Sequence, residues 1–263
     1  MTVADDAATT PPDKRAALQS VQRAFAVLDE IVNSVGPVRA SDLASSLGVD
    51  RAIVYRIVRT LAAEGLVERG PSGGYVIGPR SLVYGQAYRD RAYGRSAVLP
   101  FMADFARSLR GESQMVSMAV MVGSQMLLVD QIWSPNSTLD FMFDAGTKLP
   151  AVDTAAGRAV LAYMSESEGV EAVGREAWDG LQERLAAIRE RGGVEFHQGV
   201  GTRAGQTAIA AAIFPPVGSP RVGLVLSGMG LDDEQVVDSV PAAQVRRYAQ
   251  LISEALARVP AGH

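Results

Sequence analysis

The stretch from Asp50 to Leu61 constrains the chain most, because its apolar and basic residues separate onto two faces of a helix. At about 100° per residue, its aliphatic residues fall within one arc of roughly 140°, the width of a stripe that packs on a core. Asp50 can accept hydrogen bonds from the free backbone N–H groups of the first turn. Such a helix packs on one side and presents its other side to solvent or to a polyanion. That other side carries Arg51, Ala52, Tyr55, Arg56 and Arg59.

The segments around this helix predict a winged helix-turn-helix. Residues 41–47 form a two-turn helix that Gly48 ends, and the helix at 50–64 begins two residues later. A short helix, a tight turn with glycine and a second amphipathic helix are typical of the helix-turn-helix motif. Residues 66–69 and 75–77 predict two strands joined by a turn rich in glycine, which form the wing. Each piece alone also fits a small helical bundle with a solvated basic face, but their order favours a DNA-binding domain.

The charge of the chain is divided unevenly. Residues 14–110 hold 14 Arg and Lys against 8 Asp and Glu, whereas residues 111–263 hold 11 against 18. A basic first part and an acidic second part indicate two tasks, with the polyanion assigned to the first. The absence of cysteine excludes a disulfide framework and a thiolate metal site. No signal peptide and no membrane span are predicted, so we expect a cytoplasmic protein without a membrane partner.

The remaining segments predict an α+β domain. A helix at 20–35, capped by Ser20 and ended by Gly36, precedes the helix-turn-helix, and a connecting helix with solvated arginines follows the wing. Further on, the apolar pattern predicts a helix at 98–109, a Gly- and Ala-rich helix at 153–164, polar helices within 169–191 and a last helix from Asp232 to Ala257. Five strands are predicted between these helices, at 115–122, 125–132, 194–198, 207–214 and 222–227.

Several short motifs resemble the IclR family of bacterial transcription regulators. The most specific is Gly146-Thr147-Lys148-Leu149-Pro150 followed by residues 154–162, and residues 205–214 and 226–228 resemble the closing strands. The resemblance covers residues 14–259. It implies a disordered arm (1–13), a winged helix-turn-helix DNA-binding domain (14–79), a linker helix (80–96) and a GAF-like effector-binding domain (97–259). The implied activity is repression at a palindromic operator by a homodimer or a dimer of dimers that responds to a small-molecule effector.

The resemblance also implies which residues contact operator DNA. Arg51, Arg56 and Arg59 are expected to contact phosphates or guanine edges, and Tyr55 a thymine methyl group or a phosphate. Many relatives carry a Ser-Thr pair where this chain has Ala52-Ile53, so we expect a different operator. The predicted contacts outside that helix are Arg39 and Ser41 at the DNA backbone and Arg69 and Gly73 on the wing.

The effector pocket implied by the resemblance lies between the sheet and the helix that begins near Thr154. Ala208 replaces a Cys and Val225 a Ser of relatives that bind small acids, so we expect a less polar pocket and a larger, more apolar effector. Organic acids and aromatic compounds are the expected classes. His197 is interpreted as a strand residue or pocket wall. The predicted pocket residues are Met118, Val129, Phe141, Pro150, Thr154, Ala155, Gly157, His197, Gln198, Ala208, Val225 and Ser227.

An enzyme with an appended helix-turn-helix is the alternative interpretation. The chain has only two histidines and no G-x-S-x-G motif, and no His, Asp and Glu residues show metal-ligand spacing. Residues 199–205 are one residue away from a dinucleotide-binding fingerprint but do not lie between a strand and a helix. We therefore expect no catalytic residue, no cofactor and no metal.

Overall fold

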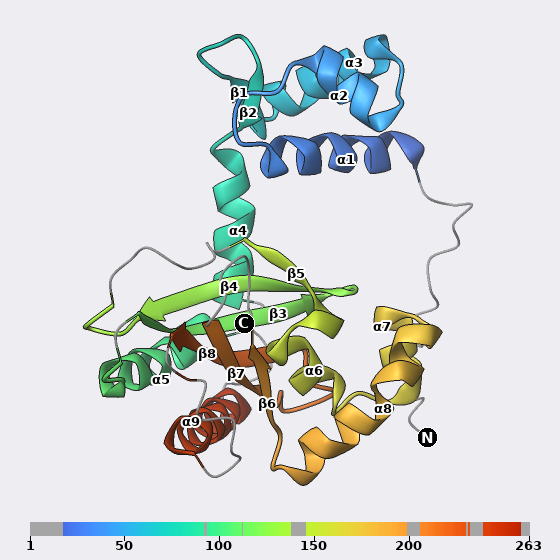
Figure 1. Cartoon of the computed structure of the whole chain (residues 1–263). Helices are drawn as coiled ribbons and strands as arrows, with labels where there is room; N and C mark the ends of the chain where they lie inside the picture. Colours follow the sequence, from blue (N-terminus) through green and yellow to red (C-terminus); the bar gives the residue numbers. More distant parts are fainter. Residues whose placement is uncertain are drawn as a thin grey trace, which may run out of the picture. The chain divides into compact units, whose positions relative to one another are not determined.

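The computed structural model describes residues 18–91, 94–111, 113–137, 146–198, 206–229, 231 and 239–258. The chain forms two compact units that divide after Tyr88 (Figure 1). None of the helices within the described residues is both long enough and apolar enough to cross a lipid bilayer.

The first unit is a winged helix-turn-helix, as predicted. Its core contains Val27, Leu43, Val54, Val58 and Tyr75, so the helices and the wing share one apolar centre. Its elements are α1 (Gln19–Asn33), α2 (Ala40–Leu47), α3 (Arg51–Ala63), β1 (Val67–Arg69), β2 (Tyr75–Ile77) and the first part of α4 (Arg80–Arg91).

Local hydrogen bonds set the ends of these helices. The Asp50 carboxylate accepts from the Ala52 N–H at 2.8 Å, which confirms the predicted cap of α3. Gly48 has a φ of 60° and ends α2 in the left-handed conformation that glycine adopts at low cost. The ends predicted for α1 were wrong: the helix begins at Gln19 without a side-chain cap and ends at Asn33, and the hydroxyl of the following Ser34 donates to the Ile31 carbonyl at 3.2 Å.

The second unit is built on one antiparallel sheet with the strand order β5-β4-β3-β8-β7-β6. The strands are β3 (Gln114–Val122), β4 (Gln125–Trp133), β5 (Lys148–Pro150), β6 (Val194–Gln198), β7 (Gln206–Ile213) and β8 (Val222–Met229). Five of them match the predicted strands. The edge strand β5 was missed, because three residues are too few to show an alternating pattern.

Helices cover both faces of this sheet (Figure 1). One face packs on α5 (Arg95–Ser108) and α9 (Val240–Ala257), whose Phe105 and Tyr248 rings stack at 4.6 Å. The other face packs on α6 (Ala155–Leu161) and α8 (Arg175–Glu190), with the 3₁₀ turn η1 (Ala151–Asp153) before α6 and α7 (Glu166–Val173) after it. The last helix begins at Val240 after its cap Ser239, and the predicted start at Asp232 lies outside the described residues.

Two arginines that were predicted to be solvated are instead paired inside the second unit. Asp130 on β4 is only 5% exposed, and its carboxylate contacts Arg89 at 2.8 Å and Arg95 at 2.5 Å. A buried carboxylate needs such partners, because burial without them costs several kcal/mol. The end of α4 and the start of α5 are thereby held to β4.

Candidate functional site

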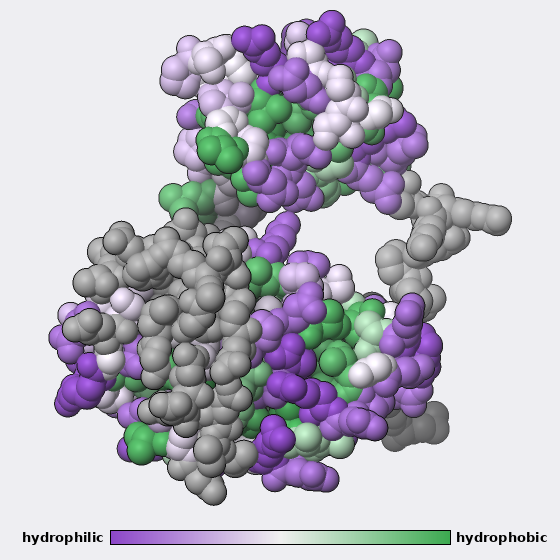
Figure 2. Space-filling view, in the orientation of Figure 1, coloured by the Kyte–Doolittle hydropathy of each residue, from purple (hydrophilic) through white to green (hydrophobic). Residues whose placement is uncertain are grey.

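The exposed face of α3 is the first candidate site. Arg51, Ala52, Arg56 and Arg59 are exposed, and so is Tyr55, at 45%. None of these three arginines forms an ion pair with another described residue, so their guanidinium groups are available to an anion. Polar residues cover much of the visible surface of this unit (Figure 2).

The buried face of α3 is narrower than predicted. Val54, Val58 and Leu61 are buried and the half-buried Ile57 packs against the same core, whereas Ile53 is half-buried and lies outside it. Both half-buried residues line a groove that α1 shares with α3 and that also contains Phe25, which is 63% exposed. The core-facing stripe therefore spans a smaller arc than the sequence pattern indicated.

The other predicted DNA contacts lie outside α3 and differ in their exposure and in their hydrogen-bond partners. Arg39 is exposed directly before α2, and the Ser41 hydroxyl donates to the Asp42 carboxylate at 3.0 Å. The Arg69 guanidinium donates to the Gly73 carbonyl at 2.6 Å and lies 4.4 Å from the centre of the Tyr75 ring. Arg69 thus holds the wing in shape, and Gly73 is exposed at the wing tip.

A cavity of about 200 Å³ in the second unit is the second candidate site. It lies between β5, η1 and the start of α6 on one side and the strands β3, β4, β6, β7 and β8 on the other. An apolar cavity of about 150 Å³ holds a benzene molecule, so this cavity has room for one substituted ring. Its lining residues are Met115, Ser117, Ala119, Met126, Leu128, Thr147, Leu149, Pro150, Asp153, Thr154, Ala155, Ala156, His197, Ala208, Val225 and Ser227.

The structure brings most of the predicted pocket residues together. Those that line the cavity are Pro150, Thr154, Ala155, His197, Ala208, Val225 and Ser227. Phe141 lies outside the described residues, and of Gln198 only the backbone, at the end of β6, is described.

Three predicted pocket residues lie elsewhere. Met118 and Val129 belong to the core under the opposite face of the sheet, because neighbouring strand residues point to opposite faces. Their neighbours Ser117 and Leu128, which the sequence interpretation missed, line the cavity instead. Gly157 supports the cavity from behind: a Cβ atom there would lie 2.1 Å from the Ala151 carbonyl oxygen, so glycine lets η1 pack closely on α6.

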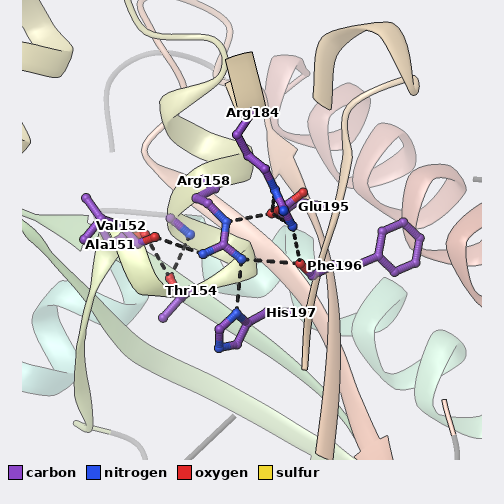
Figure 3. A network of polar contacts seen from close by, with 9 residues as sticks. Ala151, Val152, Thr154, Arg158, Arg184, Glu195, Phe196 and His197 are labelled. Atoms are coloured by element: carbon purple, nitrogen blue, oxygen red, sulfur yellow. Dashed lines mark hydrogen bonds and ion pairs between the residues drawn. The ribbon is translucent and has the colours of Figure 1, made fainter. Parts of the chain in front are cut away.

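A buried ionic network adjoins the cavity (Figure 3). The Arg158 guanidinium donates to Glu195 at 2.6 Å, to the Val152 carbonyl at 2.9 Å and to the Phe196 carbonyl at 3.3 Å. Arg184 contacts the same Glu195 oxygen at 2.8 Å. Arg158 is 8% exposed and Glu195 is 1% exposed, so both charges are shielded from water. Sequence reasoning gave no sign of this pair, because charged residues on a helix and a strand are usually solvated.

The network reaches the cavity through His197. A terminal nitrogen of Arg158 lies 3.2 Å from the His197 Nδ1 atom. Burial, and then the positive charge of Arg158, lower the pKa of His197 below its ordinary value. Apart from His197, the only ionisable residue among the described lining residues is Asp153. The described residues contain no cluster of three or more His, Asp or Glu side chains suited to a metal ion.

Comparison with known proteins identifies the two units. Residues 20–71 match a family profile described as the IclR helix-turn-helix domain. Residues 86–254 match a profile described as bacterial transcriptional regulator IclR C-terminal. The crystal structure of an IclR family transcriptional regulator from Brucella abortus has the same fold, with a TM-score of 0.73 at 21% identity over 94% of each chain.

Similar curated proteins include two regulators. The glycerol operon regulatory protein of Streptomyces coelicolor is 34% identical over 158 residues, which are 59% of this chain and 61% of that protein. The match to that relative thus spans less than two thirds of its length. The transcriptional repressor IclR of Escherichia coli is 27% identical over 228 residues, 80% of each chain. With both units matched and the larger match alone covering more than half of the residues, the chain belongs to the IclR family of bacterial transcriptional regulators.

Proposed function

We propose that the protein is a ligand-responsive repressor that binds a palindromic operator and takes a small apolar effector into its second unit. The observation that supports this most is the separation of two sites. One unit has an exposed face of unpaired arginines beside a wing, and the other has a mainly apolar cavity. A ligand that binds one conformation of such a protein more tightly shifts its affinity for DNA.

The DNA contacts are assigned to the exposed side of α3. Arg51, Arg56 and Arg59 bind phosphates or chelate a guanine edge, and Tyr55 lies between them on the same face. Ala52 lets a base edge approach closely. Arg39 and Ser41 contact the DNA backbone, and the wing, held by Arg69, places Gly73 at the minor groove.

The test is fluorescence anisotropy of the full chain on DNA from upstream of its own gene, over a range of salt concentrations. Removing two phosphate contacts with Arg56→Ala plus Arg59→Ala should weaken binding and lower the salt slope by about two. The matched control is Arg107→Ala plus Arg110→Ala, which removes two exposed arginines from the second unit. Equal losses in both double variants, or binding that competitor DNA of random sequence abolishes, would contradict the proposal.

We also propose that the protein acts as a homodimer or a dimer of dimers, because one recognition helix reads only a few base pairs. Apolar side chains on the outside of α1 support self-association: Leu18, Val21, Phe25 and Val32 are each at least 47% exposed. Light scattering during size-exclusion chromatography measures the mass of the full chain, alone and bound to operator DNA. A mass that corresponds to one chain per two-fold operator at micromolar concentration would refute this part.

The effector is assigned to the cavity, and its class is a small aromatic or organic acid compound larger than a three-carbon acid. Titration calorimetry with benzoate, 4-hydroxybenzoate, pyruvate and glyoxylate tests this. Ala208→Leu should fill part of the cavity and abolish binding of the ring compounds, whereas Ala257→Leu on the exposed end of α9 should not. Tight binding of glyoxylate alone would contradict the assignment.

A further inference from the structure

We infer that His197 is the hydrogen-bond donor that sets the specificity of the cavity, held by Arg158 in the tautomer with its proton on Nε2. Within the classes proposed above, the preferred ligand is accordingly a small aromatic molecule that is neutral rather than acidic and has one carbonyl oxygen that accepts from this donor. The inference rests on the proposed function, since it concerns the ligand of the same cavity, but it adds the chemistry that selects it.

The position of Arg158 leaves it no freedom to turn away from His197. Its Nε atom donates to Glu195, one terminal nitrogen donates to the Val152 carbonyl, and the other donates to the Phe196 carbonyl and faces His197 Nδ1. A guanidinium has only donors and does not lose its proton in proteins. The atom that faces it at 3.2 Å must therefore accept, so Nδ1 carries no hydrogen.

The charges around His197 agree with a neutral ring. A second proton would place a cation against Arg158 in a half-buried place, and both burial and Arg158 lower the pKa of the ring. Arg184 acts in the same direction. Glu195 and Asp153 act in the opposite direction, but the single charge of Glu195 is shared between two arginines, so the group it forms with Arg158 and Arg184 keeps a net positive charge.

The remaining proton is directed away from the network. Figure 3 shows the second ring nitrogen, Nε2, on the side of the ring away from Arg158. His197 lines the cavity, and its Nε2 atom has no hydrogen-bond partner among the described residues. His197 is half-buried, so water can reach this N–H group, and an acceptor on the ligand that replaces the water gives a net gain.

The other walls indicate what carries that acceptor. Most of the lining is aliphatic or thioether, including Met115, Leu128 and Leu149, which suits a ring. No arginine or lysine is among the described lining residues, whereas Asp153 is. A carboxylate would bring a second negative charge near Asp153, and no cation among the described lining residues would pair with it. A ketone, aldehyde or ester oxygen satisfies His197 without that cost.

The first test needs no ligand. The chain has two histidines, His197 and the last residue His263, so long-range ¹H–¹⁵N spectra of the labelled full chain contain two imidazole systems. His263→Gln identifies which signals belong to His197. We expect His197 at neutral pH with an unprotonated Nδ1 and a protonated Nε2. A proton on Nδ1, or on both nitrogens, would overturn the inference.

The second test uses acetophenone, α-methylstyrene and benzoate as probes, which share a ring and differ at the acceptor. By calorimetry on the full chain, we expect acetophenone to bind about tenfold more tightly than α-methylstyrene, the ratio for about 1.4 kcal/mol from one hydrogen bond. Benzoate should bind less tightly than acetophenone. His197→Phe keeps a ring but no donor and should remove the preference for acetophenone, and His197→Gln, with an amide donor, should restore part of it.

The outcomes separate this inference from the proposed function. If the probes bind but the preference for acetophenone is absent, or is the same in His197→Phe, the cavity is a ligand site and the role of His197 is wrong. If benzoate binds most tightly, the neutral ligand class is wrong. If none of the probes binds the folded wild-type chain while operator binding persists, the assignment of this cavity to small aromatic ligands fails, and the inference fails with it.

Discussion

Replacing Glu195 with glutamine should destabilise the second unit by about 2–4 kcal/mol. The change keeps the size of the side chain and one acceptor oxygen but removes a charge that is 1% exposed. Arg158, whose side chain is 9% exposed, would then lose the anion 2.6 Å from its Nε atom. Removing one partner of a buried ion pair costs about 3–5 kcal/mol, because the other charge stays buried without compensation.

Two features of the network reduce that figure. The Arg184 side chain is 51% exposed, so water can replace its contact with Glu195. Arg158 keeps its bonds to the Val152 and Phe196 carbonyls, which still accept from it after the change. Because of these two effects, the expected loss of stability is about 2–4 kcal/mol and not the full 3–5 kcal/mol.

Urea denaturation followed by tryptophan fluorescence measures the effect. Both tryptophans, Trp133 and Trp178, lie in the second unit, so the signal reports on that unit alone. With a slope of about 2–3 kcal/mol per M urea, the loss should lower the midpoint by about 1 M.

The control is Glu166→Gln, which breaks a pair of the same chemistry at the surface. Glu166 contacts Arg175 at 2.6 Å, with both side chains more than half exposed. This change should alter stability by no more than about 0.5 kcal/mol. If the two variants lose the same stability, or if Glu195→Gln loses less than about 1 kcal/mol, burial does not make this network important and the reasoning is refuted.

Three further predictions concern other parts of the molecule. Asp50→Ala removes the cap of α3 and should cost the first unit about 0.5–2 kcal/mol, measured by circular dichroism during thermal unfolding. Gly157→Ala should cost about 1–3 kcal/mol and weaken ligand binding, because its Cβ would lie 2.1 Å from the Ala151 oxygen. The control Gly180→Ala on α8 has no atom within 4 Å of the added Cβ and should stabilise the unit by about 0.5–1 kcal/mol. Similar urea midpoints for the two variants would contradict this prediction. Because the pKa of His197 is lower in the folded than in the unfolded chain, the unfolded chain binds a proton more readily as the pH falls from about 7 to 5. The wild type should therefore lose more stability over that range than His197→Gln, and parallel profiles would contradict the shift.

The winged helix-turn-helix could be predicted because its signals are local. The 3.6-residue pattern of α3, the Asp50 cap and the turn at Gly48 each act within a few residues of the chain. The class of the second unit and five of its strands followed for the same reason. The exposed arginines of α3 were found because a helix has one buried side, and its pattern shows which one.

Pairing between distant residues was beyond the sequence. Arg158 and Glu195 are 37 positions apart, and Arg89 and Arg95 meet Asp130 from 41 and 35 positions away. A charged residue looks the same in a sequence whether water or a buried partner surrounds it. Only the folding of the chain brings the partners within reach and decides which charges leave the solvent.

The lining of the cavity was predicted only in part for a related reason. By itself the sequence determined that strands such as β3 are apolar from Met115 to Met121, with Ser117 as the one polar residue. It did not determine which residues of each strand face the cavity, because helices cover both faces of the sheet and no alternation of polar and apolar residues marks either one. The tertiary structure decided this by setting the register of β3 between β4 and β8, which turns Ser117 toward the cavity and Met118 into the opposite core.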